Sequence, residues 1–471
     1  MTTIATAWET VVGLEVHTEL RTLTKLFCGC RNEFGSEPNT NVCATCMGLP
    51  GSLPVLNRYA VELAIRIGSA LRCSVVPSIF HRKNYFYPDM PKDYQISQYD
   101  QPINVDGSLE LPDGTHVGIV RAHIEEDTGK TTHAGATGRI HGADHSLVDY
   151  NRAGVPLVEI VSAPDIRSAE QAKTYVSELR AILVATGASD GKMEEGSLRI
   201  DANVSVRRAG SSELGTRCEI KNMNSLRSLV RAIDHEAARQ IALVESGERV
   251  VQETRHWDEG EGRTHSMRSK EEAYDYRYFP EPDLVPLEPT DEWISDVVAS
   301  LPALPAARRA ALAGVAGVRP ADVAVAVQKE LDGLLLATIE AGADPRVALT
   351  HAEHNVDIAQ PLDPVTFARV VTMQVEGALT ATQAKVVLAE VQATGAAPDD
   401  IAKARGFESM DDDALASVVD EVIAANPDAW AKFVAGDAKV TGFFVGQVMR
   451  ATQNKADGGA VTALLRLRAA E

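Results

Sequence analysis

A proline-rich segment divides this chain into two parts that must fold differently. Residues 280–291 read Pro-Glu-Pro-Asp-Leu-Val-Pro-Leu-Glu-Pro-Thr-Asp. Because proline lacks a backbone N–H and fixes φ, its four occurrences here argue against a continuous helix or a central strand. Strand and helix patterns alternate before the segment, and helical periodicity dominates after it. The sequence therefore predicts domains at 1–291, 292–397 and 398–471, with a softer second break after Thr394.

The first part carries the periodicities of both strands and helices. Alternation over two positions predicts strands at 10–20, 117–126, 145–151, 155–161, 197–207 and 216–222. Helices are expected near 57–72, 168–186 and 225–246. Ser168 and Asn224 are expected to cap the second and third helices, since their side chains can accept hydrogen bonds from free backbone N–H groups. Gly187 is expected just after the second helix.

Length, composition and charge limit the class of protein. The chain has 471 residues, of which 45% are hydrophobic, as in ordinary globular proteins. No run approaches the ~20 apolar residues that cross a bilayer, and the N-terminus lacks the pattern of a signal peptide, so a cytoplasmic location is expected. A formal net charge of −20 argues against non-specific nucleic-acid binding. It still allows a nucleic-acid partner on a confined basic surface, or carboxylates gathered for a metal.

Four of the six cysteines form two close pairs. Cys28-Gly-Cys30 is followed, after twelve residues, by Cys43-Ala-Thr-Cys46. In a reducing compartment such a cluster indicates a metal site rather than disulfides, and two pairs can place four thiolates tetrahedrally around Zn²⁺. Four protein ligands leave no open position, so we expect a structural zinc rather than a catalytic one, with free thiols as the alternative.

Several predicted strands collect charged groups on the face opposite their apolar side chains. In addition, Glu159 interrupts the apolar run 155–161, where a carboxylate is costly unless it is paired or bound to a cation. Carboxylates with an imidazole suit Mg²⁺, and interspersed Arg and Lys suit phosphate oxygens, a combination typical of phosphoryl transfer. A merely solvated sheet face is the alternative for any single strand. The polar positions are Glu15, His17 and Glu19; Arg121, His123, Glu125 and Asp127; Arg199, Asp201 and Asn203; and Arg217, Glu219 and Lys221.

Two further segments could contact a nucleotide or a nucleic acid. Residues 80–99 interleave four of the ten tyrosines with Lys83 and Lys92, which suits an adenine or an unpaired nucleotide. A proline-broken surface loop that packs its own rings explains this pattern equally well. Residues 436–471 carry five basic and three acidic residues, so this end could contact RNA backbone. A solvated helical face is again the alternative.

Seven segments, spread over nearly the whole chain, resemble one family closely. The family is the B subunit of the aspartyl/glutamyl-tRNA(Asn/Gln) amidotransferases (GatB/GatE). The segments are Val12-Gly-Leu-Glu-Val-His-Thr-Glu-Leu, Phe80-His-Arg-Lys-Asn-Tyr-Phe-Tyr-Pro-Asp-Met-Pro-Lys-Asp-Tyr-Gln-Ile-Ser-Gln-Tyr, His123-Ile-Glu-Glu-Asp-Thr-Gly-Lys, Asp149-Tyr-Asn-Arg-Ala-Gly-Val-Pro-Leu-Val-Glu-Ile-Val-Ser, Gly196-Ser-Leu-Arg-Ile-Asp-Ala-Asn-Val-Ser-Val, Tyr276-Arg-Tyr-Phe-Pro-Glu-Pro-Asp-Leu and Lys439-Val-Thr-Gly-Phe-Phe-Val-Gly-Gln-Val-Met-Arg-Ala-Thr.

The resemblance implies a fold and a reaction. The fold would be an α+β, cradle-like catalytic domain with a mostly antiparallel sheet, then an all-α domain and a small helical tail. ATP and Mg²⁺ would serve to phosphorylate the side-chain carboxyl of Glu on tRNA(Gln) or Asp on tRNA(Asn), and ammonia would convert it to the amide. Because the chain has no Gly-Gly-Ser-Ser-Gly amidase motif, ammonia would come from a partner amidase, the A subunit, with a small C subunit to complete a heterotrimer.

The resemblance also suggests roles for individual residues. Glu15, His17 and Glu125 are the first choices for Mg²⁺ ligands, and Glu159 and Asp201 are second choices in the same catalytic site. Two alternatives stay open: a non-catalytic, zinc-containing tRNA-binding scaffold of the same complex, and a two-metal phosphatase or nuclease. The remaining candidates are Lys83, Lys92 and Arg199 for ATP phosphates or developing negative charge; Cys28, Cys30, Cys43 and Cys46 for zinc; and Lys439 and Arg450 for tRNA.

Overall fold

The computed structural model describes residues 7–135, 143–267, 276–407, 412–434, 439–452, 456 and 458–470. The chain divides into two compact units, Met1–Ala306 and Ala307–Glu471. Each unit has its own hydrophobic core or cores, and each is described by itself below.

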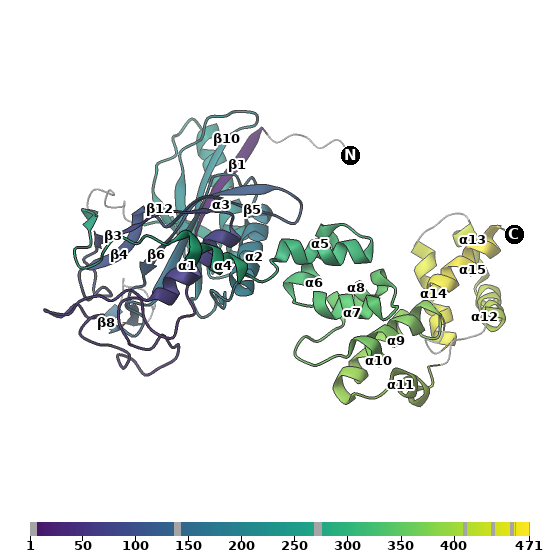
Figure 1. The fold of residues 1–471 in the computed structure, drawn as a ribbon. Helices are drawn as coiled ribbons and strands as arrows, with labels where there is room; N and C mark the ends of the chain where they lie inside the picture. The colour runs from purple at the N-terminus through teal and green to yellow at the C-terminus, as the bar shows by residue number, and fades with distance from the viewer. Residues whose placement is uncertain are drawn as a thin grey trace. The chain divides into compact units, whose positions relative to one another are not determined.

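A twelve-stranded sheet forms the centre of the first unit (Figure 1). Its strands follow the order β13-β12-β11-β10-β1-β9-β6-β4-β3-β14, while β5 pairs with β6 and β2 beside this path. Among the described strand pairs only β11–β12 is parallel, which confirms the expected mostly antiparallel sheet. The strands are β1 (Trp8–Glu19), β2 (Ser74–Val75), β3 (Ile79–Asn84), β4 (Tyr94–Gln101), β5 (Asn104–Glu110), β6 (His116–Glu126), β9 (Pro156–Ser162), β10 (Leu198–Arg208), β11 (Cys218–Lys221), β12 (Thr254–Asp258), β13 (Arg263–Ser266) and β14 (Phe279–Pro280).

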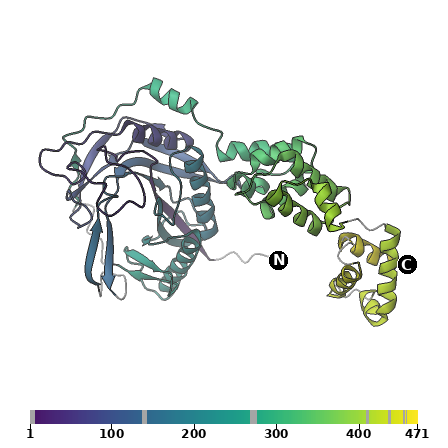
Figure 2. The same cartoon turned by 90° about the horizontal axis from the view of Figure 1, so that it is seen from below.

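Two further strands, β7 (Lys130–Gly135) and β8 (Ala143–Asp149), pair only with each other. Figure 2 shows this hairpin projecting from the rest of the first unit.

Helices cover the apolar face of the sheet. They are α1 (Arg58–Ala70), α2 (Ala169–Ala185) and α3 (Leu226–Glu245), and their buried side chains join those of β1, β6, β9 and β10 in one core. Ser168 caps α2 through its hydroxyl, and Gly187 follows the helix with φ +71°, as expected. The expected cap at Asn224 is wrong: Ser225 caps α3, because its hydroxyl is the group that accepts from Ser228 N–H.

The sheet contains strands that the alternation pattern did not reveal. Residues 80–99 lie mostly in β3 and β4, which pair antiparallel and are joined by a short loop. Strand β4 buries Gln95, Ser97 and Gln98 together with Ile96, so most of its buried side chains are polar and give no apolar alternation.

The second unit is helical and holds two separate hydrophobic cores. The first core lies among α5 (Pro305–Ala316), α6 (Ala324–Gln328), α7 (Asp332–Glu340), α8 (Pro345–His354), α9 (Pro364–Val375), α10 (Ala381–Thr394) and α11 (Pro398–Arg405). The second lies among α12 (Asp412–Ala425), α13 (Pro427–Val434), α14 (Lys439–Ala451) and α15 (Gly458–Ala470). No single described helix meets the length and hydropathy needed to cross a membrane; one bent pair, Pro305–Ala316 with Pro320–Gln328, meets them together.

The division between the two units, after Ala306, lies later than the boundary expected at 291/292, and the core that contains α10 extends beyond the boundary expected at 397/398. Helix α4 (Asp291–Ala299) follows the proline-rich segment but packs on the first unit, with Trp293 under the guanidinium of Arg58 and Val297 in the core. Likewise Ile401 and Ala402 of α11 are buried with α9 and α10. Proline interrupts helices and strands, but burial of apolar side chains decides which unit a segment joins.

The proline-rich segment is fastened to the edge of the sheet. Strand β14 pairs with β3, and the Arg82 guanidinium donates to both oxygens of the fully buried Glu281 carboxylate at 2.6 and 2.7 Å. The Asn84 amide donates to the carbonyls of Tyr276 and Arg277. These contacts fix residues 276–287, which we call the strap, against β3.

We expect Glu281→Ala to lower the free energy of unfolding of the first unit by about 3 kcal/mol, because it leaves the Arg82 guanidinium without its buried partner. Urea unfolding of the full chain measures this. Asp283→Ala is the matched control: its more exposed carboxylate lies 3.4 Å from Arg82, and its loss should cost less than about 1 kcal/mol. Equal effects of the two substitutions would contradict the assignment.

Candidate functional site

Strand register brings the expected site residues onto one face of the sheet. Glu15 of β1 lies opposite Asp201 of β10, and His17 lies opposite Glu159 of β9. Glu159 also lies opposite His123 of β6. Directly paired residues point to the same side of a sheet, so these groups share the face that the helices do not cover.

One cluster on this face combines two carboxylates and two imidazoles. His17 Nε2 lies 3.7 Å from Glu125 Oε1 and 3.6 Å from Glu159 Oε2. His123 Nε2 lies 3.9 Å from Glu125 Oε2 and 3.5 Å from the same Glu159 oxygen. These distances exceed an ordinary hydrogen bond, so the four groups surround a common space without closing on one another. We call His17, Glu125 and Glu159 the central cluster.

Burial and charge act in opposite directions within this cluster. The pKa of Glu125 is raised by burial and by the negative charge of Glu159. Burial also opposes ionisation of Glu159, but His123 and His17 outweigh it and the pKa of Glu159 falls. Burial lowers the pKa of His123 to about 4, although the negative charge of Glu159 acts in the opposite direction. A cation placed among these groups would relieve the repulsion between the two carboxylates.

Glu15 belongs to a neighbouring cluster rather than to the central one. Its carboxylate groups with those of Asp201 and Glu219. Lys221 forms ion pairs with this second cluster: its Nζ lies 2.5 Å from Asp201 Oδ2 and 3.1 Å from Glu219 Oε1. Of the three first-choice ligands from the sequence, His17 and Glu125 group with Glu159, while Glu15 lies in the adjacent group, where burial and the charge of Glu159 raise its pKa.

Arg199 lies on the same face but is already paired. Its guanidinium donates to Asp127 Oδ2 at 2.6 Å, and Arg152 approaches the same oxygen at 3.6 Å. Glu19 lies beside this group, and burial and the charge of Asp127 raise the pKa of Glu19 to about 8.

The two candidate lysines lie in different surroundings. The Lys83 ammonium lies 4.8 Å from the ring centre of Tyr276, and its charge lowers the pKa of Glu125. Within the described part of the chain it has no ion-pair partner. Lys92 instead forms an almost fully buried ion pair with Glu126, whose neighbours along β6 put it on the opposite side of the strand from Glu125.

An aromatic wall stands beside the central cluster at the β3–β14 edge. Tyr99 of β4 stacks on Tyr278 of the strap, with ring centres 5.4 Å apart, and Tyr276 meets Tyr278 edge-on. Arg121 lies over the ring of Tyr99 at 4.6 Å and reaches within 4.0 Å of Glu159. Burial and the charge of Glu125 raise the pKa of Tyr278, as expected for a phenol next to the cluster.

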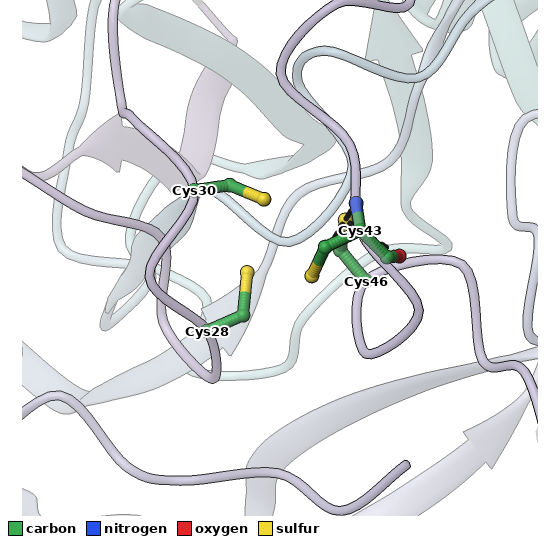
Figure 3. A group of neighbouring side chains, drawn as sticks. All are labelled: Cys28, Cys30, Cys43 and Cys46. Atoms are coloured by element: carbon green, nitrogen blue, oxygen red, sulfur yellow. Dashed lines mark hydrogen bonds between the residues drawn. The ribbon is translucent and has the colours of Figure 1, made fainter.

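The four clustered cysteines converge as the spacing predicted. Figure 3 shows the Cys28–Cys30 and Cys43–Cys46 pairs facing each other from two loops, and one Sγ from each lies within 4.8 Å of the others. The Cys43 and Cys46 sulfurs are 3.9 Å apart, close to the edge of about 3.8 Å in a tetrahedron with Zn–S bonds of about 2.3 Å. A hydrogen bond from Cys28, together with the charge of the buried Lys25, lowers the pKa of Cys46 to about 5, which favours the thiolate that binds metal. This donor set fits Zn²⁺.

The two candidate tRNA contacts lie in one helix of the second unit. Lys439 begins α14, but its side chain lies outside the described residues. Arg450 lies exposed in the last turn of α14, where a cation is favourable.

Several residues that surround the central cluster were not assigned to the site from the sequence. His123 and Arg121 were placed on the polar side of β6, two and four residues before Glu125, but were given no role in the site. Tyr278 lies outside any alternating segment, because its place depends on the antiparallel pairing of the strap with β3.

Comparison with known proteins matches this arrangement to one family. Residues 10–295 match the model of the GatB/GatE catalytic domain, and residues 347–468 match the model of the GatB domain. A protein of Frankia casuarinae, named as the B subunit of an aspartyl/glutamyl-tRNA(Asn/Gln) amidotransferase, is 50% identical over 97% of this chain and 95% of that protein. Proteins of the same name from Thermobifida fusca and Carboxydothermus hydrogenoformans are 48% and 47% identical, over 97% and 98% of this chain and 93% and 98% of theirs. The chain therefore belongs to the GatB/GatE family, and its sheet unit carries the catalytic domain of that family.

Proposed function

We propose that this chain is the B subunit of a glutamine-dependent tRNA amidotransferase, and that it activates the side-chain carboxyl of Glu-tRNA(Gln) or Asp-tRNA(Asn) with ATP. Family membership makes the chain part of a carbon–nitrogen ligase that acts on aminoacyl-tRNA. The observation that carries the activation step is the central cluster, in which two carboxylates and an imidazole face a common space near the ammonium of Lys83.

The central cluster is our proposed Mg²⁺ site. Ligands of an octahedral Mg²⁺ at about 2.1 Å lie about 3–4 Å apart, which agrees with the spacing of His17, Glu125 and Glu159. Among the described Lys and Arg side chains only Arg121 lies within ion-pair distance of these carboxylates, 4.0 Å from Glu159, whereas Lys221 compensates the second cluster directly. When bound, the metal would neutralise charge on the transferring phosphoryl oxygens. Glu15 and Asp201 are proposed as a further carboxylate pair at the edge of the same site.

The protein's own cations and rings would orient the substrates. Lys83, with no ion-pair partner among the described residues, would attract phosphate oxygens, and the rings of Tyr99, Tyr276 and Tyr278 would provide a surface for stacking beside the cluster. Ammonia from a partner amidase, the A subunit, would then displace phosphate from the activated acyl group. Arg199 and Lys92 have structural partners, so we assign them a supporting role: they hold Asp127 and Glu126 in place.

The other proposed components follow from the remaining sites. The cysteine cluster would hold a structural zinc that fixes an irregular loop beside the sheet. Helix α14 in the tail, with Arg450, would contact the tRNA backbone. A small third protein, the C subunit, would complete the heterotrimer, which we expect in the cytoplasm.

We expect Glu125→Gln to lower tRNA-dependent ATP hydrolysis and amide formation by the assembled complex at least about 100-fold, because it removes a negatively charged ligand of the proposed Mg²⁺. Phosphate release with mischarged tRNA and Mg²⁺ measures this. Glu110→Gln, on β5 and paired with Arg72, is the matched control and should leave the rate unchanged. Full activity of Glu125→Gln would favour the non-catalytic scaffold, and phosphate release without ATP would favour a phosphatase.

We expect Cys43→Ser to reduce bound zinc from about one ion per chain to nearly none and to lower the melting temperature before it affects catalysis at low temperature. Metal analysis and calorimetry of the purified chain check this. Cys73→Ser, outside the cluster, should keep the zinc. A Cys43→Ser chain that retains zinc would contradict the assignment.

We expect Arg450→Ala to weaken tRNA binding and to reduce the slope of log Kd against log salt by about 1, as for the loss of one phosphate contact. Titration of labelled tRNA at several salt concentrations measures it. Lys385→Ala removes an exposed charge from α10 and serves as control. Identical slopes for the two variants would exclude this contact.

A further inference from the structure

The buried imidazole of His123 has no hydrogen-bond partner within the described part of the chain. Its side chain is 0% exposed, and neither ring nitrogen is paired. Buried polar groups are normally hydrogen-bonded, so such a residue calls for an explanation. The ring is held in place from one side, where it meets Tyr99 edge-on at 6.1 Å between ring centres.

Only one nitrogen of His123 faces groups that could become its partner. Nε2 lies 3.5 Å from Glu159 Oε2 and 3.9 Å from Glu125 Oε2, whereas Nδ1 has no acceptor among the described residues. The ring proton is therefore best placed on Nε2, pointing at the carboxylates. An imidazole in that state donates a hydrogen bond and has no lone pair to offer a metal from the same atom.

His17 approaches the same two carboxylates but, unlike His123, its side chain is partly exposed. Its Nε2 lies 3.7 Å from the other oxygen of Glu125, and its side chain is 20% exposed, whereas that of His123 is fully buried. The two histidines can therefore play different roles. His17 can offer a nitrogen lone pair to an ion, whereas His123 can donate a hydrogen bond to the carboxylates.

We propose that His123 is a positioning residue for the metal site: its Nε2–H donates to Glu159, and secondarily to Glu125, and orients these carboxylates toward a divalent cation. This inference rests on the proposed function of the central cluster. A small movement of Glu159 toward His123 would close their 3.5 Å separation to a hydrogen bond. Groups that hold metal ligands in this way commonly change metal affinity 10- to 100-fold when they are lost.

The test measures Mn²⁺ binding to the full chain without nucleotide, by electron paramagnetic resonance or calorimetry. His123→Phe keeps a planar ring against Tyr99 but has no donor, whereas His123→Gln places an amide N–H near the original Nε2. We expect His123→Phe to weaken Mn²⁺ binding about 10- to 100-fold and His123→Gln to restore most of the loss. In the assembled complex the Mg²⁺ concentration for half-maximal activity should rise, with little change in kcat at saturating Mg²⁺.

His235→Leu is the control, because His235 also has a buried unpaired ring nitrogen but packs on Trp257 from α3. It should leave Mn²⁺ affinity unchanged. Wild-type affinity in His123→Phe, or no recovery in His123→Gln, would overturn the positioning role. Absence of Mn²⁺ binding in the wild-type chain would instead overturn the proposed metal site itself.

Discussion

The antiparallel pairing of β1 between β9 and β10 is the constraint on which the rest of the structure depends. Side chains alternate along a strand, so this register decides at once which residues enter the core and which face solvent. It puts Val12, Leu14 and Val16 against the helices, and Glu15 and His17 on the open face. A slip of one residue would exchange the two sets and lose both the core and the site.

Charge compensation divides the polar face into parts with different chemistry. Lys221 is paired with the carboxylates near Glu15, and Arg199 with Asp127, so these groups are largely balanced. Beside Glu125 and Glu159 there are imidazoles and a more distant guanidinium, and burial together with the charge of Glu159 raises the pKa of Glu125. This contrast, rather than the number of carboxylates, singles out the central cluster as the place for a cation.

The sequence predicted those strands that have one apolar and one polar face. It did not predict strands in which polar side chains are buried. Strands β1, β6 and β10 alternate clearly, and in β9 a single carboxylate interrupts an apolar run, so their positions and polar residues were found. Strands β3 and β4 bury polar side chains and were missed as strands. Alternation also could not show that Glu15 and His17 belong to different clusters. Residues two apart lie about 6.6 Å apart along a strand, so they contact different residues on the neighbouring strands. Only the strand order shows which residues those are. The cysteine cluster was predictable because spacing alone limits its geometry.

The strap has a consequence for the order in which the molecule is built. The site contains residues of β1, near the start of the chain, and Tyr278 of the aromatic wall, which lies in the strap. The Arg82–Glu281 pair holds the strap in place. The neighbours of β1 lie more than a hundred residues downstream, so chain closure must precede most of the stabilising contacts, and such topologies fold slowly. During synthesis a nascent chain that ends before residue 281 lacks the Glu281 partner of Arg82. The polar face of the sheet is therefore complete only when the ribosome begins to synthesise the helical unit.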